Sequence, residues 1–399
     1  MDNAQRVLIV GAGPVGVTLA LLLAQRGLPV TVLEAEAQPI IDYRASTFHP
    51  PTMDMLEESG ITAGLLAMGR VCPTFQYRDR REGKIAEFDL GLLRNDTRHP
   101  YRLQCEQFKL VEFVLQRLAT MPEVEVRFAH RVESVVQSHD GVAALVTTPS
   151  GAERFAGSWL VGTDGGRSTV RKSLGIEFEG LTYPERFLVA GTTFDFRSAI
   201  ADLCSVHYIA DADEWVTLLE IPDMWRFIAP VQAASDEEAL SDAFIQSRLQ
   251  GFVPRGTHYD IQVRAIYRAH QRVAATYRMG RAFVAGDAAH LNNPIGGMGL
   301  NGGLHDALDL ADRIARVWRG DATVDILDGY ERKRKPVVVS AILAQTAQNK
   351  RLLEERDPVV RKETLERWRR MGSDPELAYR HVLQTSMIAA LRAAEQSSA

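Results

Sequence analysis

The hydrophobic positions at the start of the chain change from strand-like to helical spacing and back. Residues 6–10 form a short apolar run that is typical of a buried parallel strand, and residues 15–26 have helical periodicity, which Gly27 ends. A second apolar run, residues 30–33, ends in Glu34. This order predicts a βαβ unit at the N-terminus.

The order of strand, turn and helix returns near residue 286. Residues 281–285 predict another buried strand, and a glycine-rich turn at residues 294–299 leads into an amphipathic helix at about residues 300–318. Asp287 stands where the strand ends. Its carboxylate would therefore lie beside a second helix N-terminus.

The rest of the pattern predicts an α/β fold with a second sheet. Residues 73–100 and 178–275 contain most of the strand-like runs, with one helix near residues 236–250, and predict a mainly antiparallel substrate-binding sheet inserted into the α/β domain. Residues 331–399 predict C-terminal helices. The discontinuous α/β domain would comprise residues 1–72, 101–177 and 276–330.

The turn of the first unit has the spacing of a dinucleotide-binding motif. Gly11 permits the tight turn, Gly13 lets the backbone approach a pyrophosphate, and Gly16 lets the helix pack closely on the strand. The helix N-terminus offers N–H groups and partial positive charge to phosphates. Glu34 can accept hydrogen bonds from a ribose. A glycine-rich turn without a ligand would show part of this pattern, but the complete unit favours a dinucleotide.

The second unit favours a flavin, because flavin and nicotinamide enzymes share the first motif. Asp287 can accept hydrogen bonds from ribityl hydroxyls, and the dipole of the following helix can stabilise negative charge on the reduced flavin ring. His290 follows closely and could be either a core residue or a proton carrier. The sequence therefore predicts bound FAD.

Four blocks make the chain similar to the class A flavoprotein monooxygenases, which include para-hydroxybenzoate hydroxylase and 3-(3-hydroxyphenyl)propionate hydroxylase. The blocks are residues 11–16 with Glu34, 43–46, 160–168 and 286–301. The resemblance covers roughly residues 5–335. It implies a Rossmann-like FAD-binding domain of the GR2 type, and hydroxylation of a phenolic or related aromatic substrate with NADH or NADPH and O2 through a flavin C4a-hydroperoxide.

The resemblance also implies which residues contact the cofactor. Positions matching Arg44 and Gln104 contact the flavin in the family, and those matching residues 164–167 serve both the flavin and the passing nicotinamide. Taken singly, Arg44 could be a surface residue and Gln104 a helix-start residue. The full set of expected contacts is Gly11, Gly13, Pro14, Val15, Gly16, Glu34, Ala35, Arg44, Gln104, Val132, Asp164, Gly165, Arg167, Gly286, Asp287, Pro294, Gly297, Gly299, Leu300 and Asn301.

The substrate pocket is expected on the strands of the inserted sheet. The flavin carries the oxygen chemistry, so the protein needs no metal and no covalent nucleophile, only a water-poor pocket with donors and a base. Alternation places His207 and Tyr208 on opposite faces of their strand, so at most one of them faces the flavin. An inward Arg226 would imply an acidic substrate. The catalytic or pocket candidates are His207, Tyr208, Trp215, Trp225, Arg226 and Tyr267.

Composition argues against several other classes of protein. The 46 basic and 51 acidic residues give a formal net charge of −5 without a basic stripe, which disfavours nucleic-acid binding. Cys72, Cys105 and Cys204 lack the spacing of a metal or dithiol site and favour a reducing compartment. No apolar run is long enough for a membrane span. We expect a cytoplasmic monomer or homodimer.

Two other functions remain open at this point. A halogenase or reductase could use the same flavin site, although residues 224–230 do not match the Trp-x-Trp-x-Ile-Pro motif of flavin halogenases. A non-catalytic FAD-binding sensor would also keep residues 287–301, so that segment argues only weakly against it. The identity of the substrate and the choice between NADH and NADPH are not encoded in a readable motif.

Overall fold

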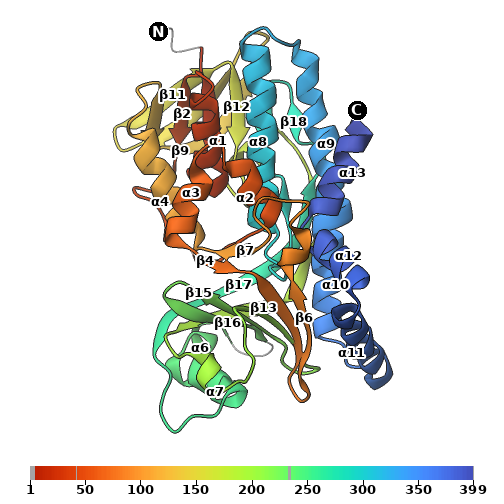
Figure 1. The fold of residues 1–399 in the computed structure, drawn as a ribbon. Coiled ribbons are helices and arrows are strands. Elements are labelled where there is room, and N and C mark those ends of the chain that lie inside the picture. Colours follow the sequence, from red (N-terminus) through yellow and green to blue (C-terminus); the bar gives the residue numbers. More distant parts are fainter. Residues whose placement is uncertain (1–4, 42, 232–234, 399) are drawn as a thin grey trace.

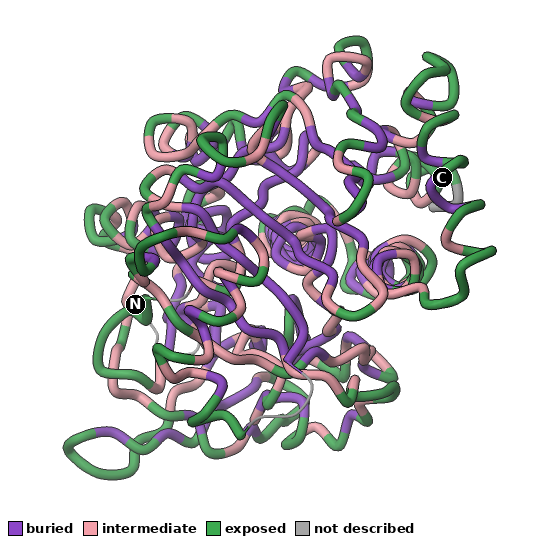
Figure 2. Tube along the Cα trace, turned by 90° about the horizontal axis from the view of Figure 1, so that it is seen from below, coloured by how far each residue is buried: buried purple, intermediate pink, exposed green. Residues whose placement is uncertain are grey.

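A computed structural model describes residues 5–41, 43–231 and 235–398. An α/β part lies at one end of the molecule, a large sheet at the other, and the C-terminal helices run along one side of both (Figure 1). Buried residues concentrate in the middle of the molecule and exposed residues at its rim (Figure 2). The expected fold class is confirmed.

The α/β part is built on a six-stranded sheet, parallel except for one edge strand. The three central strands are fully buried, because helix packing and a small three-stranded sheet within residues 131–157 together cover them. In spatial order the strands are β18 (Arg278–Met279), β19 (Ala282–Val284), β12 (Trp159–Gly162), β1 (Val7–Val10), β2 (Val30–Leu33) and β8 (Val124–Arg127).

Helices and two small sheets complete this part. α1 (Pro14–Ala24) packs against both α8 (Gly299–Trp318) and α4 (Gln107–Leu118). The other elements are α2 (Pro50–Leu56), α3 (Ile61–Met68), α5 (Thr169–Ser173), the sheet of β9 (Arg131–Gln137), β10 (Val142–Thr148) and β11 (Gly151–Gly157), and the sheet of β3 (Thr47–Phe48), β7 (Arg102–Gln104) and β4 (Arg70–Cys72).

The second large sheet has eight strands, and all of its pairs are antiparallel except β14 with β5. Strands from both inserted segments lie in it, while the division into domains stays a prediction. In spatial order they are β20 (His290–Leu291), β17 (Ile261–Ala274), β13 (Phe178–Thr192), β16 (Met224–Val231), β15 (Val216–Ile221), β14 (Val206–Ala210), β5 (Thr74–Asp79) and β6 (Gly83–Asp89).

The two faces of the eight-stranded sheet bury different partners. One face packs against α7 (Asp242–Phe252) through an apolar cluster that includes Phe227 and Leu249. The other face packs against the C-terminal helices through Phe75 and Trp368. The helices in this cluster are α10 (Ala344–Leu353), α11 (Pro358–Ser373), α12 (Pro375–Thr385) and α13 (Ile388–Ser398), whereas α9 (Gly329–Val337) packs on α8 and α13.

The helix expected near residues 236–250 is two helices, so that expectation was wrong in detail. α6 (Asp236–Ala239) ends early, and the hydroxyl of Ser241 accepts a hydrogen bond of 3.2 Å from the N–H of Phe244 at the start of α7. A serine that caps a new helix in this way interrupts the periodicity of the older one. The break changes no residue of the expected site.

Candidate functional site

A cleft of about 1400 Å³ opens between the α/β part and the eight-stranded sheet. Its walls come from the loop after β1, the segment that follows β2, the turn before α8, and the strands β14 to β17. Small-molecule pockets usually enclose about 300–1,000 Å³, so this cleft has room for a long cofactor together with a second molecule.

The first glycine-rich loop is held in a single conformation by its neighbours. Gly11 has φ +102°, and a Cβ atom on Gly16 would lie 2.0 Å from the carbonyl oxygen of Gly11, so only glycine fits there. The carboxylate of Glu34 accepts a hydrogen bond of 2.6 Å from the N–H of Ala12. No side chain caps the start of α1 at Gly13, so the first N–H groups of this helix face the cleft and can bind an anion.

The Asp-Gly motif lies on the cleft wall and also caps a helix. Asp164 accepts hydrogen bonds from the hydroxyl of Ser168 at 2.5 Å and from the N–H of Thr169 at 2.7 Å, at the start of α5. Burial raises the pKa of the Asp164 carboxyl, although these hydrogen bonds oppose the shift. Arg167 lines the cleft beside it. Asp164 can therefore cap α5 while the Asp-Gly motif also forms part of the cleft wall.

The turn at residues 286–290 rests on a buried charged cluster. The carboxylate of Asp306 accepts hydrogen bonds from His290 Nε2 at 2.7 Å, Arg334 Nε at 2.8 Å and the N–H of Gly286 at 3.1 Å. Burial alone would raise the pKa of Asp306, but His290 and Arg334 outweigh it and lower the pKa to about 2. His290 is thus a buried structural residue, and Asp287 beside it lines the cleft.

Asn301 and His49 hold the turn that precedes α8. The amide of Asn301 donates to the carbonyl oxygens of Thr47 at 2.8 Å and Gly297 at 2.7 Å, and accepts from the N–H of His49 at 2.9 Å. His49 Nε2 donates to the carbonyl oxygen of Gly296 at 2.8 Å. Burial, with the charge of Arg102, lowers the pKa of His49 to about 3, so this ring stays neutral.

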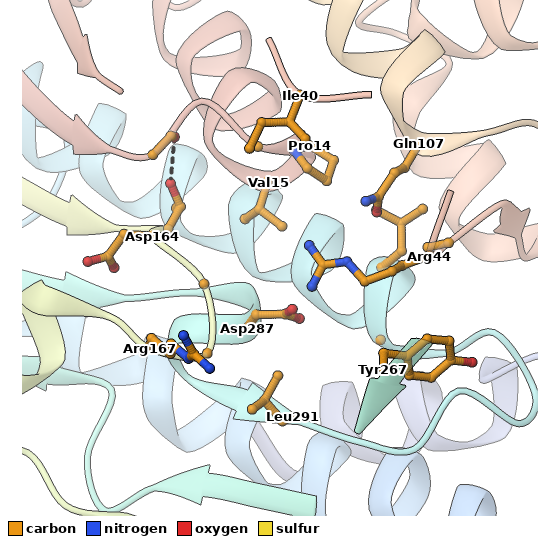
Figure 3. Close-up of a pocket in the computed structure, with 18 of the residues that line it drawn as sticks. Pro14, Val15, Ile40, Arg44, Gln107, Asp164, Arg167, Tyr267, Asp287 and Leu291 are labelled. Carbon is orange, nitrogen blue, oxygen red and sulfur yellow. Dashed lines mark hydrogen bonds between the residues drawn. The ribbon is translucent and has the colours of Figure 1, made fainter. Parts of the chain in front are cut away.

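The structure does not bring Gln104 to the cleft. Gln104 is fully buried in β7, where its side-chain oxygen accepts a hydrogen bond of 2.9 Å from the hydroxyl of Ser46. Gln107, the first residue of α4, lines the cleft with Arg44 and Asp287 instead (Figure 3). Gln104 is the last residue of β7, and its side chain is buried against Thr47 of β3. Gln107, three residues later at the start of α4, reaches the cleft.

The eight-stranded sheet contributes Tyr208, Arg226 and Tyr267 to the cleft. Arg226 is 1% exposed and donates from Nη1 to the hydroxyl of Ser46 at 2.9 Å. Of the other candidates, His207, Trp215 and Trp225 do not line the cleft. His207 and Trp225 lie on the opposite face, where His207 Nε2 donates to the carbonyl oxygen of Cys204 and the two rings stack. The alternation along each strand is as expected, and packing against α7 decides which face is inward.

Most of the expected cofactor residues border the cleft. Gly16, Gln104, Gly286 and Asn301 lie behind its surface and shape it. The residues that line it are Gly11, Gly13, Pro14, Val15, Glu34, Ala35, Arg44, Val132, Asp164, Gly165, Arg167, Asp287, Pro294, Gly297, Gly299 and Leu300.

Comparison with known proteins identifies the family. The model of the FAD-binding domain family matches residues 4–345. This chain belongs to that family. It is 33% identical over 405 residues to para-nitrophenol 4-monooxygenase of Pseudomonas sp. (strain WBC-3), with 99% of each chain covered. It is also 33% identical to 6-hydroxy-3-succinoylpyridine 3-monooxygenase of Pseudomonas putida (strain DSM 28022 / S16), over 90% of this chain and 91% of the relative.

A solved structure of the FAD-binding domain family agrees over the whole fold. The crystal structure of p-nitrophenol 4-monooxygenase from Pseudomonas putida DLL-E4 matches with a TM-score of 0.92 at 31% identity, and covers 97% of this chain and 99% of that one. Family membership makes this protein an FAD-dependent aromatic monooxygenase. The halogenase, reductase and sensor alternatives are not favoured.

Sequence reasoning missed several residues that shape this family member's site. Asp306 and Arg334 could have been found from one signal in the sequence, because each is a charged residue on the apolar face of a helix. Thr217, which also lines the cleft, left none, since threonine is common in strands. Within the described ranges, no group of three or more His, Cys, Asp or Glu side chains could hold a metal ion. None of the helices described is both long and apolar enough to cross a membrane.

Proposed function

We propose that this monooxygenase hydroxylates a phenol whose ring lies between the turn at residues 294–299 and the inner face of the eight-stranded sheet. The observation that carries this proposal is the buried guanidinium of Arg226, which faces the cleft across from the flavin-binding turns. A guanidinium that faces the cleft can donate charge-assisted hydrogen bonds to an anionic oxygen. A phenolate, which is the electron-rich form that electrophilic hydroxylation needs, offers such an oxygen.

The residues of the cleft fit FAD along its length. The N-terminus of α1 at Gly13 would hold the pyrophosphate, and Glu34 the ribose of the adenosine. Asp287 would accept hydrogen bonds from the ribityl chain, and the N-terminus of α8 would face the flavin ring. Bound FAD supplies the activated oxygen.

The chain's own groups would bind and orient the phenol. Burial raises the pKa of Tyr267, so its hydroxyl stays protonated and can donate a hydrogen bond. Arg226 would hold the phenolate oxygen, and the surrounding apolar surface would exclude water from the reacting ring. A relative whose name describes a para-nitrophenol 4-monooxygenase supports a phenolic substrate.

The nicotinamide co-substrate would enter from the side of Arg167. Arg268 and Arg272 lie near it: these three arginines all help to lower the pKa of His270, after the larger effect of burial. All four side chains line the cleft. Such a concentration of positive charge suits the phosphates of NADH or NADPH.

We also infer a cytoplasmic protein that is a monomer or homodimer and does not bind nucleic acid. The formal net charge of −5 supports the last point. Cys72, Cys105 and Cys204 are free thiols, and burial raises the pKa of the first two to about 12, which makes them inert. Size-exclusion chromatography with light scattering would determine the oligomeric state.

The test begins with the purified yellow protein. A panel of phenols is screened for faster oxidation of NADH and of NADPH, with oxygen uptake measured and the product identified by mass spectrometry. We expect a hydroxylated product with stoichiometric oxygen uptake. Arg226→Ala should weaken phenolate binding strongly and Arg226→Lys less so, while His207→Gln on the outer face serves as the control. Protein that binds no FAD, or unchanged substrate affinity in Arg226→Ala, would refute the proposal.

A further inference from the structure

Two hydroxyl groups on the sheet side of the cleft have no hydrogen-bond partner among the described residues. These are Thr217 Oγ1 and Tyr267 Oη, both of them buried atoms. Most buried hydroxyls in proteins are hydrogen-bonded, because leaving one without a partner costs stability. A ligand in the cleft could pair with both. Tyr267 already has a place in the proposed function, but Thr217 does not.

The register of the sheet places Thr217 close to Arg226. On β15, Thr217 pairs with Tyr208 of β14 on one side and with Ile228 of β16 on the other. Leu219, two residues along the same strand, pairs with Arg226. Residues in this diagonal relation on one face of a sheet lie about 7–8 Å apart. A ring held at Arg226 therefore brings its other substituents within reach of Thr217.

The surroundings of Thr217 favour an oxygen acceptor over an amine. Tyr208, its direct neighbour, accepts a hydrogen bond of 3.2 Å from Nη1 of the buried Arg102. Arg226 supplies a second buried positive charge. Among the described residues of β14 to β17 that line the cleft, none carries a carboxylate. The Thr217 hydroxyl would thus donate to a group with negative charge on its oxygens.

We infer that Thr217 is a specificity-determining residue that donates a hydrogen bond to a second, oxygen-bearing substituent of the phenol, such as a nitro, carboxylate or carbonyl group. This inference rests on the proposed function and narrows its substrate class. The competing explanation is that threonine only fills space in a strand, a role in which valine has nearly the same shape. The two explanations differ in the hydroxyl alone.

The experiment compares Thr217→Val, which removes the hydroxyl, with Thr217→Ser, which keeps it. Thr18→Val is the matched control, because Thr18 in α1 also has a buried hydroxyl without a partner in the part of the chain that the structure describes, but does not line the cleft. Each FAD-loaded variant is titrated with 2-, 3- and 4-nitrophenol and with the corresponding methylphenols. Binding is followed by the change in flavin absorbance without NADPH, and kcat/KM is measured with it.

For at least one nitrophenol isomer, Thr217→Val should raise Kd and lower kcat/KM about tenfold, the effect of one neutral hydrogen bond of about 1.4 kcal/mol. Binding of the matching methylphenol should stay within about twofold of the wild type. Thr217→Ser should retain most of the wild-type preference for the nitrophenol over the matching methylphenol, and Thr18→Val should retain all of it.

Two outcomes would overturn the inference alone. An equal loss for nitrophenols and methylphenols in Thr217→Val would mean that Thr217 only packs, and no loss for either would mean that its hydroxyl is idle. Failure of every phenol to bind the wild-type protein that carries FAD would instead refute the proposed function, and the inference would fall with it.

Discussion

Asp306→Asn should destabilise the protein by several kcal/mol, because this carboxylate is the counter-charge of a buried arginine. The side chains of Asp306, His290 and Arg334 are at most 2% exposed. Asparagine keeps the shape and can still accept from the N–H of Gly286. It removes the negative charge, however, and turns an amide N–H₂ toward Arg334 Nε, which donates to the other carboxylate oxygen. The guanidinium of Arg334 is then buried without its anion.

The size of the effect follows from these contacts. Removing one partner of a buried ion pair costs about 3–5 kcal/mol. With an unfolding entropy of about 2.1 cal/mol/K per residue, a chain of 399 residues should lose about 4–6 °C in Tm. The pKa of Asp306 is lowered to about 2, so its stabilising charge is present above the usual carboxyl range and is lost only as the pH falls through about 2. The decrease in Tm caused by Asp306→Asn should therefore be constant between pH 6 and 8.

The assay is thermal unfolding at one scan rate, followed by circular dichroism and by release of FAD fluorescence. Saturating FAD is added to every sample, because ligand binding itself raises Tm. Asp312→Asn is the control: it lies on the same helix, its side chain is 56% exposed, and its contact with Arg316 at 3.9 Å should contribute about 0–1 kcal/mol. Equal Tm values for the two variants would refute the account of a buried charge.

Three further predictions concern the cofactor and pH. Asp287→Ala should purify nearly colourless because the ribityl chain loses its anchor; absorbance at full FAD occupancy would contradict this role. Gly16→Ala should release FAD, since its Cβ would lie 2.0 Å from the carbonyl oxygen of Gly11. Equilibrium dialysis measures the affinity for FAD, and an affinity equal to that of the wild type would count against this prediction. Burial lowers the pKa of His381 to about 4, so the unfolded chain takes up a proton first and stability falls as the pH drops from about 6.5 to 4, by up to about 3 kcal/mol. His381→Phe should flatten that part of the Tm profile against pH, and an unchanged slope would exclude the mechanism.

The amino-acid sequence alone determined the features that depend on local geometry. Glycine spacing, a helix start and a following acidic residue specify a dinucleotide-binding turn within about 25 residues, because every contact in that unit is short-range. The opposite orientation of His207 and Tyr208 is likewise a property of any strand. Other expected cofactor residues, such as Arg44 and Asp164, also border the cleft, but they were implied by the resemblance to the class A flavoprotein monooxygenases and not by local geometry.

The tertiary structure decided everything that depends on which surfaces meet. The alternation of side chains along a strand determines that His207 and Tyr208 point to opposite faces of the sheet. Only the packing of α7 on one face turned Tyr208 toward the cleft and His207 away from it. Asp306 and Arg334 are 28 positions apart, and no local pattern joins them before α8 and α9 come together. Thr217 looks like an ordinary strand residue until the fold leaves its hydroxyl without a partner within residues 5–41, 43–231 and 235–398. Contacts between residues far apart in the sequence produce no periodic pattern in it, because they form only when the chain folds.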